Sequence, residues 1–212
     1  MVLIDSSNST LPPLLKKRKN QIKDPNTTLG LLAGPEMKIF QNKDQPEWIF
    51  GYGSLMWDPG FHHTEKLPAI LEGYHRAFCV YSHHYRGTTE LPGLVLGLNL
   101  GGKCKGIAFR ISREARHEII TYLDERELIG YAYKPKRLPI SFDDGTSVLA
   151  YTYIADQRHP HFAGRLSKER LANLIISAKG AAGTNQDYAL RATRALEANG
   201  FIDPYLQSLL EK

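Results

Sequence analysis

The feature of this chain that most constrains its fold is a series of short strand-like segments separated by glycine-containing turns. The predicted strands cover residues 48–50, 72–85, 94–100, 105–111, 137–142 and 147–154. Gly101-Gly102 and Asp144-Gly145 each stand between two of these segments, where such dipeptides are typical of hairpin turns. Short strands joined by turns predict a curved antiparallel sheet or barrel.

Helices are predicted beside these strands. The first begins at Ser112, a favourable N-cap with Glu114 in the first turn, and ends at residue 127 or 128 before Gly130. Three more helices are expected over residues 167–178, 185–198 and 204–210. Strands followed by helices predict an α+β protein.

The chain has 212 residues, of which 42% are hydrophobic and 23% charged, as in a globular protein with one domain. Residues 1–45 are rich in turn formers and predict a flexible extension, which leaves residues 46–212 as the domain. No apolar run approaches the ~18 residues that cross a bilayer. The sequence therefore predicts no membrane partner.

Positive charge is concentrated in the extension. Residues 16–19 read Lys-Lys-Arg-Lys and account for four of the five net positive charges, so the rest of the chain is nearly neutral. No apolar segment follows this cluster, so a secretory signal is not expected. The charge pattern predicts no nucleic-acid partner, and no obligatory protein partner is expected.

The two cysteines do not form a recognisable disulfide or metal pattern. Cys79 and Cys104 lie in strand-like segments and are not spaced as C-x-x-C. We interpret both as reduced, buried thiols, which are typical of a cytoplasmic protein.

One carboxylate lies out of place on the first predicted helix. Ile119, Ile120 and Leu123 form its apolar stripe, and continuing that stripe by four residues from Leu123 reaches Glu127. Burial raises the pKa of a carboxyl group towards the range useful for proton transfer. The neighbouring Asp124, Glu125 and Arg126 are expected to stay in water. Periodicity alone leaves open whether the helix has already frayed at Glu127 and exposes it.

A glycine-rich loop follows the first strand. It reads Phe50-Gly51-Tyr52-Gly53-Ser54-Leu55. Glycines allow backbone N–H groups to approach a ligand closely and to bind a carboxylate or an oxyanion. The pattern matches neither common nucleotide-binding motif. A plain turn remains the alternative.

Six segments in order resemble the ChaC family of γ-glutamylcyclotransferases and span about residues 47–200. They are Trp48-Ile-Phe-Gly-Tyr-Gly-Ser-Leu-Met-Trp57, Gly73-Tyr-His-Arg-Ala-Phe-Cys79, Arg86-Gly-Thr-Thr-Glu-Leu-Pro-Gly93, Leu123-Asp-Glu-Arg-Glu-Leu-Ile-Gly-Tyr131, Asp156-Gln-Arg-His-Pro160 and Gly183-Thr-Asn-Gln-Asp-Tyr188. The resemblance is to the bacterial branch of the family. It implies a small mixed, mainly antiparallel β-barrel with flanking helices.

The resemblance also implies roles for particular residues. Glu127 takes the place of the family's catalytic glutamate, and the loop from Phe50 to Leu55, above all Tyr52, Gly53, Ser54 and Leu55, takes the place of its γ-glutamyl-binding loop. We add Arg86, Tyr131 and Tyr188 as substrate-binding candidates. A surface ion pair remains an alternative for Arg86, as does simple packing on the barrel for Tyr188.

The implied reaction is cleavage of glutathione to 5-oxo-L-proline and Cys-Gly, with no metal and no cofactor. The histidine pairs His62-His63 and His83-His84 and the His159-Pro-His161 segment match no zinc spacing. The residue after the catalytic position is Leu128 where other branches carry Lys, which puts the exact substrate in question. Cyclisation of other γ-glutamyl amines and a non-catalytic role in cation transport remain open alternatives.

Overall fold

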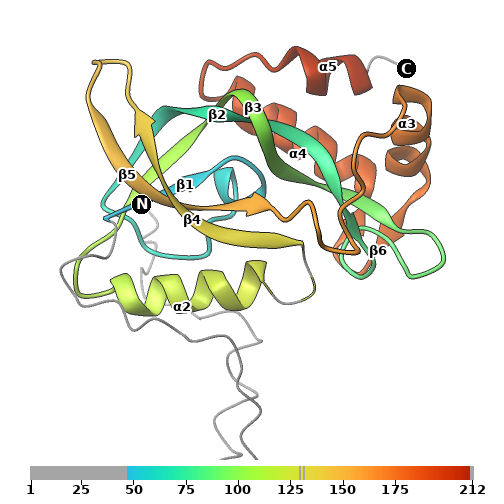
Figure 1. The fold of residues 1–212 in the computed structure, drawn as a ribbon, viewed down its shortest axis with the longest axis horizontal. Helices are drawn as coiled ribbons and strands as arrows, with labels where there is room; N and C mark the ends of the chain where they lie inside the picture. Colours follow the sequence, from blue (N-terminus) through green and yellow to red (C-terminus); the bar gives the residue numbers. More distant parts are fainter. Residues whose placement is uncertain (1–46, 129, 131, 211–212) are drawn as a thin grey trace, which may run out of the picture. The chain divides into compact units, whose positions relative to one another are not determined.

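Five strands close into a small barrel in a computed structural model that describes residues 47–210 apart from 129 and 131 (Figure 1). The strands are β1 (Trp48–Gly51), β2 (Glu65–Ser82), β3 (Gly93–Arg110), β4 (Tyr133–Ser141) and β5 (Ser147–Ala155). They follow the order β1-β3-β2-β4-β5, with only β1 and β5 pairing in parallel among these strands. The predicted mixed, mainly antiparallel barrel is confirmed.

The barrel is filled by aliphatic and aromatic side chains that alternate along the strands. Phe50 from β1, Leu71 from β2 and Phe109 from β3 are fully buried. Each such side chain stabilises the fold by roughly 1.5–3 kcal/mol when it leaves water. The two thiols, Cys79 and Cys104, are free and buried in the same core.

The predicted hairpin at Gly101-Gly102 is wrong. β3 continues without a break through both glycines, and β2 pairs with it on both sides. The register slips between Glu72 and Tyr74, so the glycines form a β-bulge with φ values of 90° and 76°. A bulge and a hairpin turn both need residues with positive φ, which is why the sequence did not separate them.

The second predicted hairpin is confirmed. β4 and β5 pair from Tyr133 to Ala155 and are joined by a turn at Gly145, whose φ is 82°. The Asp144 carboxylate accepts hydrogen bonds from the Thr146 backbone N–H at 2.9 Å and from its hydroxyl at 2.6 Å. This local bonding holds the turn closed.

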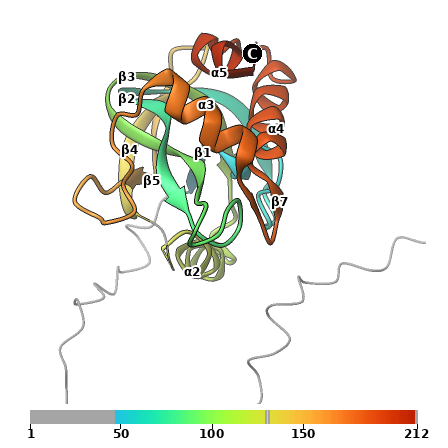
Figure 2. The same cartoon turned by 90° about the vertical axis from the view of Figure 1, so that its right-hand side faces the viewer.

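Helices lie on opposite sides of the barrel. α2 (Arg116–Glu127) lies along one side, whereas α4 (Asn185–Glu197) and α5 (Pro204–Leu210) lie along the other (Figures 1 and 2). α3 (Lys168–Ser177) stands next to α4. A single 3-10 turn, η1 (Ser54–Met56), and the short strands β6 (Lys179–Gly180) and β7 (Gly183–Thr184) complete the described elements.

The first residues of the helices agree with the prediction for α3 and α4 but not for α2. Ser167 and Thr184 each accept a hydrogen bond from the backbone three residues on, and α3 and α4 begin where predicted. The first helix begins at Arg116, four residues later than predicted. Ser112 instead accepts a hydrogen bond from the Ala115 N–H in the turn that precedes α2.

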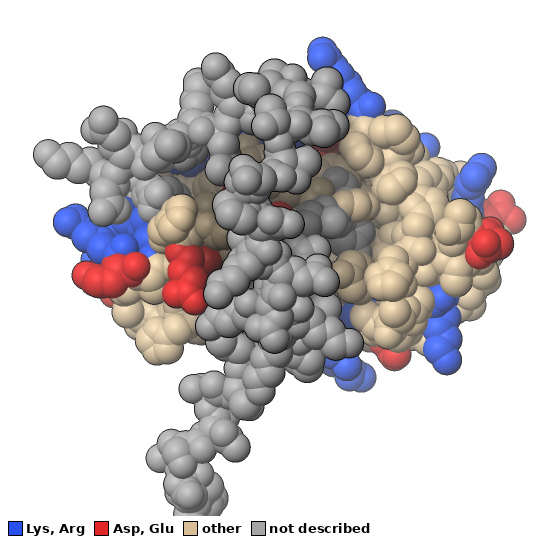
Figure 3. All heavy atoms as spheres, turned by 90° about the horizontal axis from the view of Figure 1, so that it is seen from below, with Lys and Arg blue, Asp and Glu red and all other residues tan. Residues whose placement is uncertain are grey.

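The outer surface on the α2 side carries charges of both signs. Lys and Arg side chains lie beside Asp and Glu side chains on the visible part of this face (Figure 3). Near the start of α2, the Glu47 carboxylate forms ion pairs with Arg113 and Arg116. Within the described part of the chain, no helix combines the length and apolar character needed to cross a membrane. The predicted extension, residues 1–45, lies outside the described residues.

Candidate active site

The glycine-rich loop is anchored at its start and turns sharply at its end. Phe50 is fully buried, and its carbonyl oxygen accepts a hydrogen bond from the Thr152 hydroxyl at 2.9 Å. A side chain at Gly51 would approach Leu55 to 2.9 Å, so only glycine fits there. Gly53 then caps η1, which carries Ser54. Phe50 and Gly51 therefore fasten the loop to the barrel, and its far end turns towards α2.

Glu127 lies in the last turn of α2 with its side chain only 17% exposed. Leu123 and Ile119, one and two turns earlier, are buried in the hydrophobic core. The helix continues through Glu127, so the carboxylate is largely enclosed as the apolar stripe predicted. The alternative of a frayed, exposed end is excluded.

Arg126 joins Glu127 to the glycine-rich loop. Its Nε lies 3.2 Å from a Glu127 carboxylate oxygen, and its Nη2 donates to the Ser54 hydroxyl at 3.0 Å. Its Nη1 donates to the Asp58 carbonyl at 2.9 Å. The prediction that Arg126 stays in water is wrong, because this guanidinium bridges the end of α2 and the loop.

Asp124 is the second correction on this helix. Its carboxylate accepts hydrogen bonds from the hydroxyls of Tyr151 at 2.8 Å and Tyr153 at 2.7 Å. These phenols come from β5, so Asp124 attaches α2 to the barrel one turn before Glu127. Of the three neighbours expected to face water, Glu125 alone is exposed.

The electrostatic surroundings of Glu127 favour proton transfer. Burial raises the pKa of Glu127, and the positive charge of Arg126 partly opposes this shift. A carboxyl group with a raised pKa exchanges protons more readily near neutral pH. The geometry therefore provides a carboxylate that is shielded from water and balanced by one cation.

Three tyrosines surround this carboxylate and the loop. Burial, assisted by the negative charge of Glu127, raises the pKa of both Tyr52 and Tyr133, so both phenols stay protonated. The Tyr133 hydroxyl donates to the Leu96 carbonyl at 2.6 Å, and the Leu96 N–H donates to the Tyr188 hydroxyl at 3.3 Å. The backbone carbonyl and N–H of Leu96 thus fix the positions of the Tyr133 and Tyr188 hydroxyls.

Tyr133 is the main site residue that the sequence did not reveal. The predicted strand began at residue 137, whereas β4 begins at Tyr133 itself. The Tyr131-Ala-Tyr133 alternation after Gly130 is the signal that would have extended the strand and pointed to this residue. Tyr131 lies outside the described residues.

Tyr188, a predicted binding residue, lies beside Gly53 of the loop, and Arg86 packs against Tyr188. Tyr188 is buried, contacts Trp57 and Phe78 edge-on, and a Cβ at Gly53 would lie 3.3 Å from its hydroxyl. Tyr188 thus packs on the barrel and also faces the loop. The Arg86 guanidinium lies 5.3 Å from the centre of the Tyr188 ring and donates to the Ala182 carbonyl at 2.5 Å. Arg86 therefore adjoins the candidate site by packing against the ring of Tyr188.

Three of the histidines form a cluster. The rings of His83 and His159 lie 4.6 Å and 5.0 Å from that of His161. Over residues 47–210, the described side chains include no group of three or more His, Cys, Asp or Glu placed to hold a metal ion.

Comparison with known proteins identifies the family. Residues 47–212 match the family described as ChaC-like protein. The chain is 40% identical to a glutathione-specific γ-glutamylcyclotransferase of Escherichia coli over 78% of this chain and 71% of the relative. It is 32% identical to γ-glutamylcyclotransferase 2-3 of Arabidopsis thaliana over 76% of this chain and 85% of the relative.

Solved structures agree on the fold. A crystal structure of a glutathione-specific γ-glutamyl cyclotransferase from yeast superposes with a TM-score of 0.74 at 23% identity, covering 79% of this chain and 95% of the yeast chain. The family match over residues 47–212 contains the whole barrel, the glycine-rich loop and Glu127. The chain therefore belongs to the ChaC family.

Proposed function

We propose that this protein is a glutathione-specific γ-glutamylcyclotransferase that cleaves glutathione into 5-oxo-L-proline and Cys-Gly. The observation that carries the proposal is the enclosed Glu127 carboxylate, joined to the glycine-rich loop by Arg126. Curated relatives at 40% and 31% identity, from a bacterium and a fission yeast, are named for this activity.

The reaction is an internal displacement. The α-amine nitrogen of the glutamyl part forms a bond to its own γ-carbonyl carbon, and the bond from that carbon to the cysteine nitrogen breaks. A five-membered lactam and Cys-Gly result, and no water is consumed. Because both reacting groups belong to one molecule, holding the chain folded can supply an effective molarity of about 10⁵–10⁸ M.

Glu127 is the proposed proton carrier. An α-amine titrates near about 8, so it must lose a proton before or during its attack. Glu127 accepts that proton and then delivers it to the departing cysteine nitrogen. A single carboxylate can serve both steps because the raised pKa makes its ionised form a stronger base for the first transfer, and the protonated form then carries the same proton to the leaving nitrogen.

The loop and the tyrosines are proposed to hold the substrate. Backbone N–H groups from Tyr52 to Leu55 can bind the γ-carbonyl oxygen as it becomes an oxyanion. Protonated Tyr52 is a hydrogen-bond donor near Glu127, whereas Tyr133, whose proton is donated to the Leu96 carbonyl, can offer its oxygen as an acceptor. Arg86, Tyr131 and Tyr188 remain proposed substrate-binding residues, with Arg86 suited to a substrate carboxylate.

Replacing Glu127 tests the proposal. Glu127→Gln keeps the size of the side chain but cannot accept a proton, so release of 5-oxoproline from glutathione should fall by at least about 100-fold. Glu125→Gln, two residues away and exposed, is the matched control and should act as the wild type. Wild-type turnover by Glu127→Gln would refute the assignment.

Two alternatives give different results with other substrates. Comparable rates on glutathione and on γ-glutamyl dipeptides would indicate a general γ-glutamyl cyclotransferase. If 5-oxoproline is not formed from any γ-glutamyl compound, the non-catalytic alternative replaces the proposal.

The reduced thiols support a cytoplasmic location for this activity. Burial raises the pKa of Cys79 to about 12 and of Cys104 to about 11, so both remain protonated and unreactive. A protein with two unpaired buried thiols is typical of a reducing compartment, in which glutathione is also kept reduced.

A further inference from the structure

A cavity with a volume of about 940 Å³ lies outside the candidate active site. Its lining comes from β2, β3, the segment before α3, α3 itself, α4 and the segment between residues 201 and 209. Neither Glu127 nor any residue of the glycine-rich loop lines it. The proposed reaction does not use this space.

The floor of the cavity is apolar. Phe78, Leu171 and Leu196 line it and are buried parts of the hydrophobic core, as are Phe201 and Leu209. The volume falls within the range of about 300–1,000 Å³ that is typical of sites for small molecules. An apolar body of a ligand would therefore leave water on entering it.

The rim of the cavity is cationic. Lys103, Lys105, Arg165 and Lys168 line it, whereas Asp203 is its one acidic lining residue. Asp203 is already neutralised by Arg76 at 2.6 Å, and Lys103 pairs with the exposed Glu72 at 2.8 Å.

The other rim cations lack a carboxylate partner. Lys105, Arg165 and Lys168 form no ion pair with any acidic side chain in the described part of the chain. The Lys105 ammonium instead lies 5.3 Å from the centre of the Phe201 ring. An excess of positive charge over an apolar floor attracts a molecule with an anionic head and a hydrocarbon body.

We infer that this cavity binds an amphipathic organic anion, with its hydrocarbon body against Phe78 and Leu171 and its anionic group at Lys105 and Lys168. A basic peptide or the Lys16–Lys19 cluster of this chain is disfavoured by charge. A flat protein partner is disfavoured because the cavity is a hollow of ligand size.

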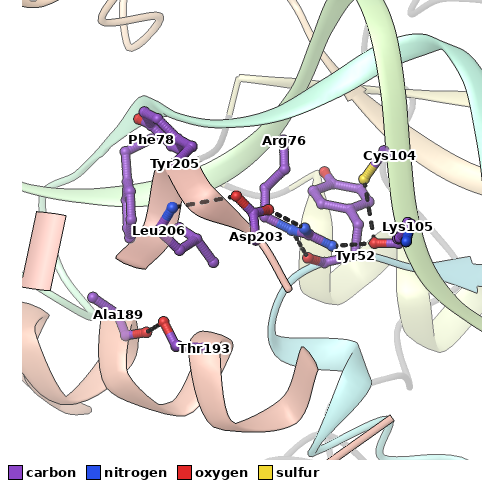
Figure 4. A network of polar contacts seen from close by, with 10 residues as sticks. All are labelled: Tyr52, Arg76, Phe78, Cys104, Lys105, Ala189, Thr193, Asp203, Tyr205 and Leu206. Atoms are coloured by element: carbon purple, nitrogen blue, oxygen red, sulfur yellow. Dashed lines mark hydrogen bonds and ion pairs between the residues drawn. The ribbon is translucent and has the colours of Figure 1, made fainter. Parts of the chain in front are cut away.

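The site adjoins the glycine-rich loop through one side chain. Arg76 lines the cavity, and its Nε donates to the Tyr52 carbonyl at 2.7 Å while its Nη2 donates to the Lys105 carbonyl (Figure 4). The two sites are thus neighbours separated by the Arg76 guanidinium, and a test must distinguish them.

Decanoate, kept below its critical micelle concentration, is the probe. Titrated calorimetrically into the full chain, it should bind saturably and at least about tenfold more tightly than decanol or decyltrimethylammonium, which lack the anionic group. Methyl resonances of Leu171 and Leu209 should shift with the same affinity. Equal affinity for all three probes would overturn the inference.

Charge reversal locates the head group. The double variant Lys105→Glu/Lys168→Glu should weaken decanoate binding by at least about tenfold. The matched control is Lys136→Glu, an exposed residue of β4 that does not line the cavity and should bind as the wild type. Both substituted sites are exposed, and the milder Lys105→Gln/Lys168→Gln double variant should show the same direction. Unchanged affinity in both double variants would refute the site.

The Glu127→Gln variant separates this inference from the proposed reaction. It should bind decanoate as tightly as the wild type, because Glu127 does not line the cavity. If binding is lost in Glu127→Gln, decanoate enters the substrate site and the inference fails. If the variant still binds decanoate, the inference about the cavity is supported. Its turnover of glutathione then tests the proposed reaction separately.

Discussion

The balance of charge at Glu127 is set by its nearest neighbour in the chain. Burial raises the pKa of this carboxyl, and Arg126 lowers it again from 3.2 Å away. In the reaction that we propose, Glu127 must be ionised to accept a proton, so activity should fall as the pH drops through a pKa above the ordinary carboxyl value of about 4.3. The proposal therefore predicts that Arg126 helps to set the lower limit of the pH range in which the protein is active.

Removing the cation should narrow that range. In Arg126→Met the opposing charge is lost, the pKa of Glu127 rises further, and the acidic limb of the kcat profile should move to higher pH. Arg126→Lys keeps the charge and should leave the limb near its wild-type position. Profiles of kcat against pH for the three proteins provide the measurement. An unmoved limb in Arg126→Met would show that this charge does not control Glu127.

The residues around Glu127 differ in how far sequence could identify them. The helical repeat predicted that Glu127 lies on the buried face of its helix, because residues four apart lie on the same face. This spacing does not depend on the rest of the fold. Asp124 and Arg126 were misjudged because their partners are distant in sequence. Arg126 reaches Ser54, 72 residues earlier, and Asp124 reaches Tyr153, 29 residues later. No local pattern carries that information.

Two glycines show how one element can be misassigned. Gly101 and Gly102 have the positive φ that a hairpin needs, yet they lie in a bulge within β3. The partner strand decides between these outcomes, since β2 pairs with β3 from Glu65 to Ser82 on both sides of the bulge. The length of β2 was underestimated because it begins seven residues before its clear alternation.

Backbone conformation alone should make Gly101 costly to replace. Its φ is 90°, and a Cβ there would meet no atom within 4 Å, so Gly101→Ala introduces strain without a clash. We expect a loss of about 1–2 kcal/mol in the free energy of unfolding in urea. Leu100→Ala, the exposed neighbour on the same strand, should change it by under about 0.5 kcal/mol. Equal stabilities of the two variants would contradict the strained bulge.

The C-terminal segment is attached to the barrel by a buried ion pair. Arg76 on β2 has a side chain that is 3% exposed, and it pairs with Asp203, which is 19% exposed, just before α5 (Figure 4). Asp203 also accepts a hydrogen bond from the Leu206 N–H at 3.2 Å and so caps α5. The same Arg76 holds the Tyr52 carbonyl, so the attachment of α5 and the position of the loop depend on one guanidinium.

The Asp203→Asn variant distinguishes the ion pair that Asp203 forms with Arg76 from its role as the N-cap of α5. Asparagine still caps a helix, but Arg76 would become a buried cation without its counter-ion, and unfolding should become easier by about 3 kcal/mol. The control is Glu72→Gln, which breaks the exposed pair with Lys103 and should cost under about 1 kcal/mol. Urea unfolding of both variants gives the comparison. Equal losses would mean that the Arg76 pair has no special role.

Within the described part of the chain, Glu127 and the lining of the large cavity come from different helices. α2 brings Glu127 to one side, and α4 and α5 cover the other (Figures 1 and 2). Residues of both α4 and α5 line the large cavity. The match to the family begins at residue 47, one residue before β1. The catalytic machinery that we propose therefore needs no residue from the predicted extension.

Deleting residues 1–40 should leave the reaction intact. We expect kcat/KM for glutathione to stay within about twofold of the full chain at both low and high salt. The control is deletion of residues 1–51, which removes β1 and opens the barrel, and which should prevent folding as judged by circular dichroism. A large loss of activity in the shorter deletion would show that the basic cluster contributes to the site.

Sequence by itself determined the features that depend on near neighbours. Besides the ordered motifs that resemble the ChaC family, these are the starts of α3 and α4, the Asp144-Gly145 turn and the phase of Glu127 on its helix. Each arises from interactions within a few residues, so the local pattern contains the whole cause.

Only the tertiary structure decided which distant residues meet. Tyr133 bonds to Leu96, 37 residues away, and Arg76 pairs with Asp203, 127 residues away. Closure of the barrel brings these groups together and excludes water between them, and burial then shifts their charges and pKa values. Glu127 was visible as a misplaced carboxylate in the sequence, but its cation, its phenols and its position beside the loop come from that closure.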